Sequence, residues 1–159
     1  MKRRYKKLDK IEIIIRPNIK IKSRQWLDKK ILKTKLLLIS QLPPKLSNLT
    51  RNATLTLLIT NDKEIQGLNK KFRKKNKPTD VLSFHLNREE QTKSDYLGDM
   101  VISIETAKKQ AKEKKTKLND ELLLLFMHGY LHLLGFDHVK PKEAKRMFEL
   151  QDGLMVNLK

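Results

Sequence analysis

The sequence contains no cysteine and no long uninterrupted apolar run, and each absence excludes a class of structure. Without cysteine the chain forms no disulfide, and any bound metal must take nitrogen or oxygen ligands. The longest apolar run, residues 122–127, is far shorter than the roughly 18 residues that a membrane span needs. The apolar stretch after the basic N-terminus, residues 11–15, is too short and too interrupted for a signal sequence. We therefore expect a cytoplasmic protein with no membrane partner.

Acidic residues are also scarce, with 18 against 36 basic residues in a chain of 159, which gives a formal net charge of +18. Such a balance favours a polyanion as partner, either a nucleic acid or an acidic membrane. Most of the basic residues are lysines, and the chain is rich in asparagine and isoleucine. An AT-rich genome produces the same composition without selection for binding, so the charge supports nucleic-acid binding without establishing it.

The apolar pattern predicts an α+β fold, with residues 1–159 forming a single domain that is long enough for a hydrophobic core. About four strands should form one mixed sheet, with about five helices packed on it. We expect strands at residues 11–15, 54–60, 80–84 and 98–103. We expect helices at about 23–40, from an Asn61 cap, at about 105–117, from an Asn119 cap, and from Pro141.

The same pattern predicts which helix residues face the core. The helix through residues 122–127 is apolar on every side and should be buried. The inward-facing residues expected on the other helices are Trp26, Leu27, Ile31 and Leu38; Ile65, Leu68 and Phe72; Ile104, Ala107 and Ala111; and Ala144, Phe148, Met155 and Leu158.

The strongest functional signal is a cluster of histidines, because three of the four in the chain, His128, His132 and His138, fall within eleven residues. His128 and His132 are four residues apart, which leaves them about 40° apart on one helix face. Gly135 can take the left-handed conformation that ends a helix, so His138 can return to the same point. Three neutral imidazoles with no fourth protein ligand describe a catalytic zinc site at the end of a buried helix. An accidental cluster of core histidines is the alternative.

This motif nearly matches the metzincin protease signature but lacks its general base. The zincin glutamate follows the first histidine, and this chain has Gly129 at that position. A metalloprotease without the catalytic glutamate is therefore the weakest of the functional hypotheses.

The histidine segment, residues 128–138 (HGYLHLLGFDH), resembles instead the YbeY family of bacterial endoribonucleases of ribosomal RNA maturation. Residues 68–73 (LNKKFR), 78–84 (PTDVLSF) and 97–103 (LGDMVIS) also match, in the family's order. Phe72 stands where the family usually has tyrosine, and His85 where it usually has proline.

The resemblance implies a metal-dependent endoribonuclease specific for single-stranded RNA. It implies action on the 3′ end of small-subunit ribosomal RNA and in ribosome quality control, with the ribosome or ribosomal proteins as partners. One divalent metal, expected to be zinc, would be the cofactor, with no small-molecule cofactor beside it. The alternative from another class is a ribosome-assembly or RNA-binding factor with a mainly structural metal. The open fourth coordination position argues against that alternative, because structural zinc sites are closed by four ligands.

Three further residues are candidates for catalysis. Arg73 can grip a phosphate through its planar fork, and the resemblance places it in the active-site cleft; a solvated basic helix end is the alternative. Asp137 could orient an imidazole ligand, or it could cap local amides in a turn. Asp99 could transfer a proton or orient a group, or it could be a structural residue of a strand end.

Overall fold

A computed structural model describes residues 11–21, 24–44, 47, 53–86 and 95–158, with only the backbone of 24–27, 38, 39 and 158. In this part of the chain the main elements are β1 (Ile11–Ile15), α1 (Arg24–Gln41), β2 (Thr54–Thr60), α3 (Asp62–Arg73), β3 (Val81–His85), β4 (Tyr96–Ser103), α5 (Ile104–Glu113), α6 (Leu118–Leu133) and α7 (Pro141–Leu158). The predicted α+β class is confirmed. Residues 87–94, between β3 and β4, lie outside the described residues.

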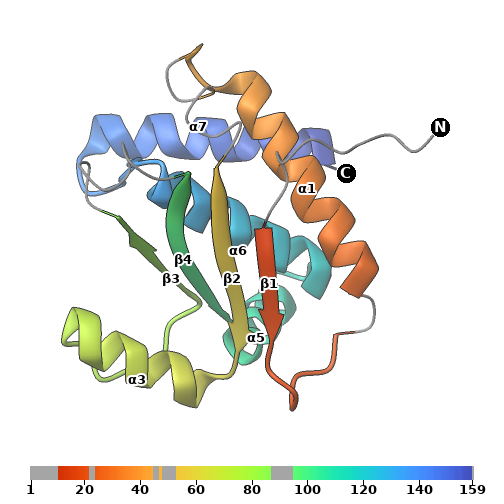
Figure 1. The fold of residues 1–159 in the computed structure, drawn as a ribbon, viewed down its shortest axis with the longest axis vertical. Helices are drawn as coiled ribbons and strands as arrows, with labels where there is room; N and C mark the ends of the chain where they lie inside the picture. Colours follow the sequence, from red (N-terminus) through yellow and green to blue (C-terminus); the bar gives the residue numbers. More distant parts are fainter. Residues whose placement is uncertain (1–10, 22–23, 45–46, 48–52, 87–94, 159) are drawn as a thin grey trace.

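The four strands form one mixed sheet in the order β1-β2-β4-β3. Strand β2 runs parallel to both β1 and β4, and the edge strand β3 runs antiparallel to β4. Helix α6 packs on β3 and β4, and helices α1, α5 and α7 surround it (Figure 1). Helix α3 lies at the opposite end of the sheet from α7. The main core therefore forms between the sheet and the group of helices centred on α6.

Helix α6 is buried as expected, because of residues 122–127 only Leu124 retains partial exposure. It begins earlier than expected, however. Lys117 is the N-cap, in extended conformation and with no side-chain hydrogen bond, so the prediction of Asn119 as the cap was wrong. Leu118 is the first residue of the helix, and its side chain packs against the core. The Asn61 cap is confirmed, since its side chain accepts a hydrogen bond from the Glu64 amide.

The inward face of α7 differs from the expected one. Met147 and Leu154 are fully buried, and Leu150 and Met155 pack against the core. Phe148 is 42% exposed, so the prediction that it faces inward was wrong. The reason is that α7 turns the stripe 147, 150, 151 and 154 towards α1 and α6, one residue out of phase with Phe148.

Other inward-facing predictions have mixed outcomes. The prediction that Phe72 faces the core was also wrong, because Phe72 is 55% exposed, although its ring packs edge-on against Phe84. Ile31, Ile65, Ile104, Ala107 and Ala111 are buried as expected. The side chains of Trp26, Leu27, Leu38 and Leu158 lie outside the described residues. Within the described part, no helix is both long and apolar enough to cross a membrane.

Candidate metal centre

The three histidines of the motif converge on one point. His128 and His132 lie on the last two turns of α6, and His138 follows in the turn that leads to α7. One ring nitrogen from each residue falls within a group whose members all lie within 4.8 Å of one another. The Nε2 atoms of His128 and His132 are 3.1 Å apart. Two imidazoles on a tetrahedral metal at bond lengths of 2.0–2.1 Å have nitrogens about 3.3 Å apart, so this donor set fits such an ion.

The turn after α6 brings His138 back, and Gly135 makes it possible. The Gly135 amide donates to the His132 carbonyl at 2.9 Å, and the Phe136 amide donates to the Leu131 carbonyl at 3.0 Å. These two bonds are the pair that defines a Schellman helix end. Gly135 has a φ of +86°, as predicted, and a Cβ there would meet no atom within 4 Å. Backbone conformation, and not space, therefore favours glycine at this position.

The other ring nitrogens of His128 and His132 are engaged, which fixes the direction of each imidazole. His132 Nδ1 donates to the carbonyl of Phe136 at 2.9 Å, and His128 Nδ1 lies 3.0 Å from Oε1 of Gln151. Both Nε2 atoms are then left as the lone-pair donors that a metal requires. Gln151 is nearly buried on α7. Sequence reasoning missed it, because nothing local links it to a histidine 23 positions away.

Burial favours the neutral, metal-binding form of these two rings. It lowers the pKa of His128 and of His132 below the usual imidazole value. The hydrogen bond with Gln151 and the charge of Asp80 partly oppose this effect on the pKa of His128. The hydrogen bond to the Phe136 carbonyl does the same for His132. Metal ligation needs unprotonated imidazole, so the environment suits a ligand role.

Gly129 is glycine for a reason of packing. A Cβ at this position would lie 2.8 Å from Sδ of Met100 and 3.0 Å from Oγ of Ser83. The Ser83 hydroxyl also donates to the Gly129 carbonyl at 3.1 Å. This point of α6 therefore contacts β3 and β4 directly. A side chain at 129 would be directed at the sheet, so a glutamate at this position, as in the zincins, would require Met100 and Ser83 to move.

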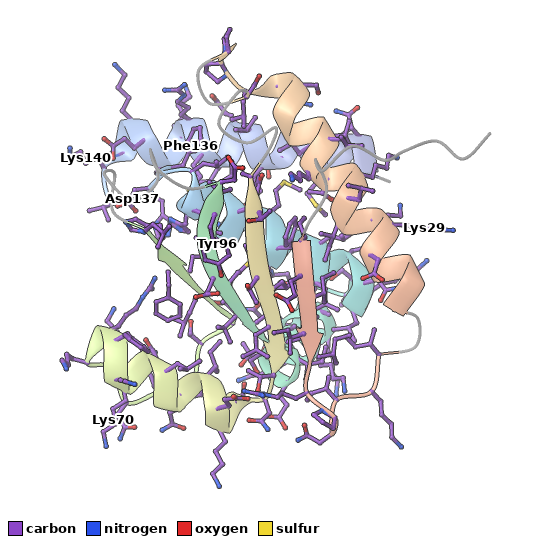
Figure 2. All side chains as sticks on the ribbon, viewed as in Figure 1. Lys29, Lys70, Tyr96, Phe136, Asp137 and Lys140 are labelled. Carbon is purple, nitrogen blue, oxygen red and sulfur yellow. The ribbon has the colours of Figure 1, made fainter. Side chains whose placement is uncertain are left out.

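Asp137 lies in the same turn but its contacts are with backbone amides. Its carboxylate accepts a hydrogen bond from the His138 amide at 2.6 Å. Bonds from the His138 and Val139 amides lower the pKa of this carboxyl. Figure 2 shows Asp137 beside Phe136 at the end of the molecule where α7 begins. These contacts fit the turn-capping alternative, while the carbonyl of Phe136 and Gln151 orient the α6 imidazoles.

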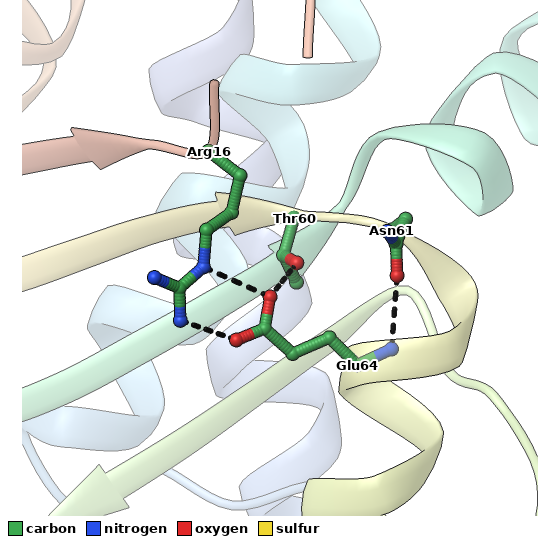
Figure 3. Close-up of polar contacts among 4 residues, drawn as sticks. All are labelled: Arg16, Thr60, Asn61 and Glu64. Atoms are coloured by element: carbon green, nitrogen blue, oxygen red, sulfur yellow. Dashed lines mark hydrogen bonds and ion pairs between the residues drawn. The ribbon is translucent and has the colours of Figure 1, made fainter. Parts of the chain in front are cut away.

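Arg73 ends α3 and is exposed. Within the described residues, no hydrogen bond or ion pair engages its guanidinium or joins it to the histidines. The other end of α3 makes several polar contacts, through Glu64 (Figure 3). There the Arg16 guanidinium pairs with the Glu64 carboxylate, which also accepts a bond from the Thr60 hydroxyl. The bond from Arg16 is the main reason that the pKa of Glu64 is lowered.

Asp99 is placed away from the histidines. Its neighbour Met100 packs on Gly129, and successive strand residues face opposite sides of a sheet, so Asp99 faces away from α6. There it accepts a hydrogen bond from the Tyr96 hydroxyl, which lies 2.9 Å from the Thr56 hydroxyl. This arrangement fits the structural alternative for Asp99.

In the part of the chain that the structure describes, lysines lie on several sides of the molecule. Figure 2 shows Lys29 on α1, Lys70 on α3 and Lys140 before α7 projecting from different sides. Charge alone therefore does not mark one face as the nucleic-acid interface, and the histidine cluster remains the most specific feature of the surface.

Comparisons with known proteins agree with the motifs. A family model described as "Endoribonuclease YbeY" matches residues 18–159. The Endoribonuclease YbeY of Aquifex aeolicus is 43% identical over 141 residues, which cover 88% of this chain and 89% of the relative. That of Nautilia profundicola is 52% identical over 117 residues, which cover 69% and 82%. The solution structure of TM1509 from Thermotoga maritima has a TM-score of 0.59 and 28% identity, covering 92% of this chain and 88% of that one.

Proposed function

This chain belongs to the endoribonuclease YbeY family, and from this premise we propose that it is a metal-dependent endoribonuclease acting on single-stranded RNA in ribosomal RNA maturation. The enzyme class expected from the sequence, a hydrolase of RNA, is the class of the family. The observation that carries metal dependence is the convergence of three imidazole nitrogens, two of them on rings oriented by hydrogen bonds.

The finer parts of the proposal extend the same premise. The metal would be zinc, and the substrate would be the 3′ end of small-subunit ribosomal RNA. The protein would also act in ribosome quality control. It would do so in the cytoplasm, with the ribosome or its proteins as partners. Residues 1–159 would form one catalytic domain. When bound, the metal would supply Lewis-acid chemistry at a phosphoryl oxygen.

Each of the proposed site residues would have a separate role. His128, His132 and His138 hold the metal, and Gln151 keeps the His128 ring in place. Arg73, whose guanidinium is exposed, would bind the reacting phosphate through two parallel N–H donors. Asp99 and Asp137 stay predictions for proton transfer or orientation, and their placement favours structural roles for both.

The assembly-factor alternative predicts a closed metal site. Among the described residues, no fourth histidine or carboxylate joins the group of three, whereas structural zinc sites have four protein ligands. This arrangement favours an enzyme. The protease alternative is weakened further by the contact of Gly129 with the sheet.

The decisive experiment combines metal analysis with RNA cleavage by the same preparation. The wild-type protein should contain one divalent metal per chain, and a chelator should stop cleavage of a single-stranded RNA. His132→Ala should lose both metal and cleavage. His85→Ala is the matched control, because His85 is exposed at the end of β3, outside the cluster. A His132→Ala protein with its full complement of metal would show that the ligand assignment is wrong.

Arg73 is tested by the order of three substitutions. Arg73→Ala should keep its metal and lose most of the cleavage rate at saturating RNA, and Arg73→Lys should recover part of it. Lys75→Ala, two residues on and also exposed, should weaken RNA binding and reduce the salt dependence of that binding, without changing the cleavage rate at saturating RNA. If Arg73→Ala behaved like Lys75→Ala, Arg73 would be a backbone contact without a catalytic role.

A further inference from the structure

Phe148 is an exposed aromatic residue beside the histidine centre. Its neighbour Met147 is fully buried in the core, whereas Phe148 is 42% exposed. The centre of its ring lies 6.4 Å from that of His128 and 6.1 Å from that of His138. The rings are nearly parallel, at angles of 22° and 17°. One side of the phenyl ring is therefore directed at the proposed metal ligands, and part of the ring is open to solvent.

The surroundings of Phe148 suit a polyanion. Lys142 and Lys145 lie on the two preceding turns of α7, and both are exposed. Arg146 is also exposed, but its guanidinium lies over the ring of Phe136, 5.5 Å from the centre of that ring. Lys145 has a carboxylate neighbour at 3.8 Å, in Glu149, but both groups are largely exposed, and such pairs are weak. Proteins that bind single-stranded nucleic acid combine basic side chains along the backbone with aromatic rings on which bases stack.

We propose that Phe148 is a stacking platform for one nucleobase of single-stranded RNA, on a nucleotide next to the phosphate that binds at the histidine centre. This proposal rests on the proposed function and adds a base-binding subsite to it. Every base has a π face, so the subsite would tolerate any sequence. It would disfavour duplex RNA, because a paired base in a helix has both faces covered by its neighbours.

The test uses the metal-loaded protein and a single-stranded RNA that it cleaves at one mapped bond. Phe148→Ala should raise KM by roughly 5- to 150-fold, the range that follows from the loss of one base–aromatic stack, with little change in kcat. Phe148→Trp should retain a low KM, and Phe148→Leu should not, because leucine is apolar but has no ring. Val156→Ala, another exposed apolar residue of α7, is the matched control and should behave as the wild type.

A change in the substrate separates stacking from structural support. RNAs with one abasic nucleotide, placed in turn at each position beside the cleaved bond, should include one on which the wild type and Phe148→Ala have the same KM. Metal content is measured for every variant. If Phe148→Ala loses metal or fails to fold, the comparison of Phe148→Leu with Phe148→Trp and the abasic series on the wild type decide the matter.

Two results would overturn the proposal. One is a Phe148→Leu protein with the KM of the wild type; the other is a penalty in Phe148→Ala that persists on every abasic RNA. Failure of the proposed function is distinguishable, because the wild type would then cleave no RNA. In that event, quenching of 2-aminopurine in the RNA by the wild type but not by Phe148→Leu would still support the stacking subsite, and equal quenching would refute it.

Discussion

Three glycines lie inside helices, and they form a matched series for testing the close contact between α6 and the sheet. Gly67 in α3 has open space where a Cβ would be, and Gly153 in α7 has only one atom, at 3.9 Å. Gly129 in α6 would bring its Cβ to 2.8 Å from Met100 and 3.0 Å from Ser83. The change from glycine to alanine raises helix propensity at all three sites, and the available space differs between them.

The expected magnitudes follow from these distances. Alanine in place of an interior helical glycine stabilises by about 0.8–1.0 kcal/mol, so Gly67→Ala and Gly153→Ala should raise the free energy of unfolding by up to that amount. An extra methyl group in a packed core costs about 1–3 kcal/mol. Gly129→Ala should therefore range from neutral to about 2 kcal/mol destabilising. The free energies of unfolding of Gly129→Ala and Gly67→Ala should differ by about 1–3 kcal/mol, which corresponds to roughly 2–12 °C in Tm for a chain of this length.

The assay is urea unfolding followed by circular dichroism, with chelator present so that bound metal adds no stability. If Gly129→Ala were as stabilising as Gly67→Ala, Met100 and Ser83 would move aside freely, and the account of Gly129 would be wrong. For the same reason, Gly129→Glu should create no peptidase. Its carboxylate would be directed into the packed contact with Met100 and Ser83, and the protein should be strongly destabilised.

Three further predictions concern the histidine centre and the ion pair at the start of α3. Gly135→Val should reduce the affinity for metal because a β-branched residue at φ +86° is strained, whereas Gly135→Asn should reduce it less. Isothermal titration with zinc measures the affinity of both variants. Equal affinities for the two would exclude backbone strain as the cause. Gln151→Leu should lower metal affinity by about 10- to 100-fold, because the His128 ring loses its orienting acceptor. Asp137→Asn should have a smaller effect on metal affinity. The reverse order would indicate that Asp137 is the orienting residue. Since the pKa of Glu64 is lowered in the folded state, its contribution to stability is present above the usual glutamate pKa and is lost as pH falls through the lowered value. The stability difference between the wild type and Glu64→Gln should therefore shrink on acidification, and a difference that is constant between pH 7 and pH 3 would contradict this.

The parts of the site that the sequence predicted are those built from local geometry. His128 and His132 share a helix face by their spacing, and a glycine one turn on is a recognised helix end, so the return of His138 could be inferred. Gln151 could not be found in this way. It reaches His128 only because α7 packs against α6, and that contact depends on tertiary structure.

The errors have the same origin. Apolar residues of α7 occupy more than one stripe, and a periodic pattern does not decide which stripe meets the core. The stripe that meets the core contains Met147 and Leu154, and Phe148 lies about 100° around the helix from Met147. Burial of the α6 platform was predictable because residues 122–127 are apolar on every side, which leaves no choice of face.

The pairing of Arg16 with Glu64 has a mechanical consequence for the far end of α3 (Figure 3). Helix α3 has 12 residues, so it is about 18 Å long, with the ion pair to Arg16, just after β1, near its first turn and Arg73 as its last residue. A pivot of about 10° at the ion pair would displace the last residue by about 3 Å, and a misplacement of about 1 Å can reduce a rate about 100-fold. If Arg73 acts on the reacting phosphate as proposed, its position would depend on the contacts that hold α3, which are the Arg16–Glu64 pair near the first turn and the ring contact between Phe72 and Phe84 near the last.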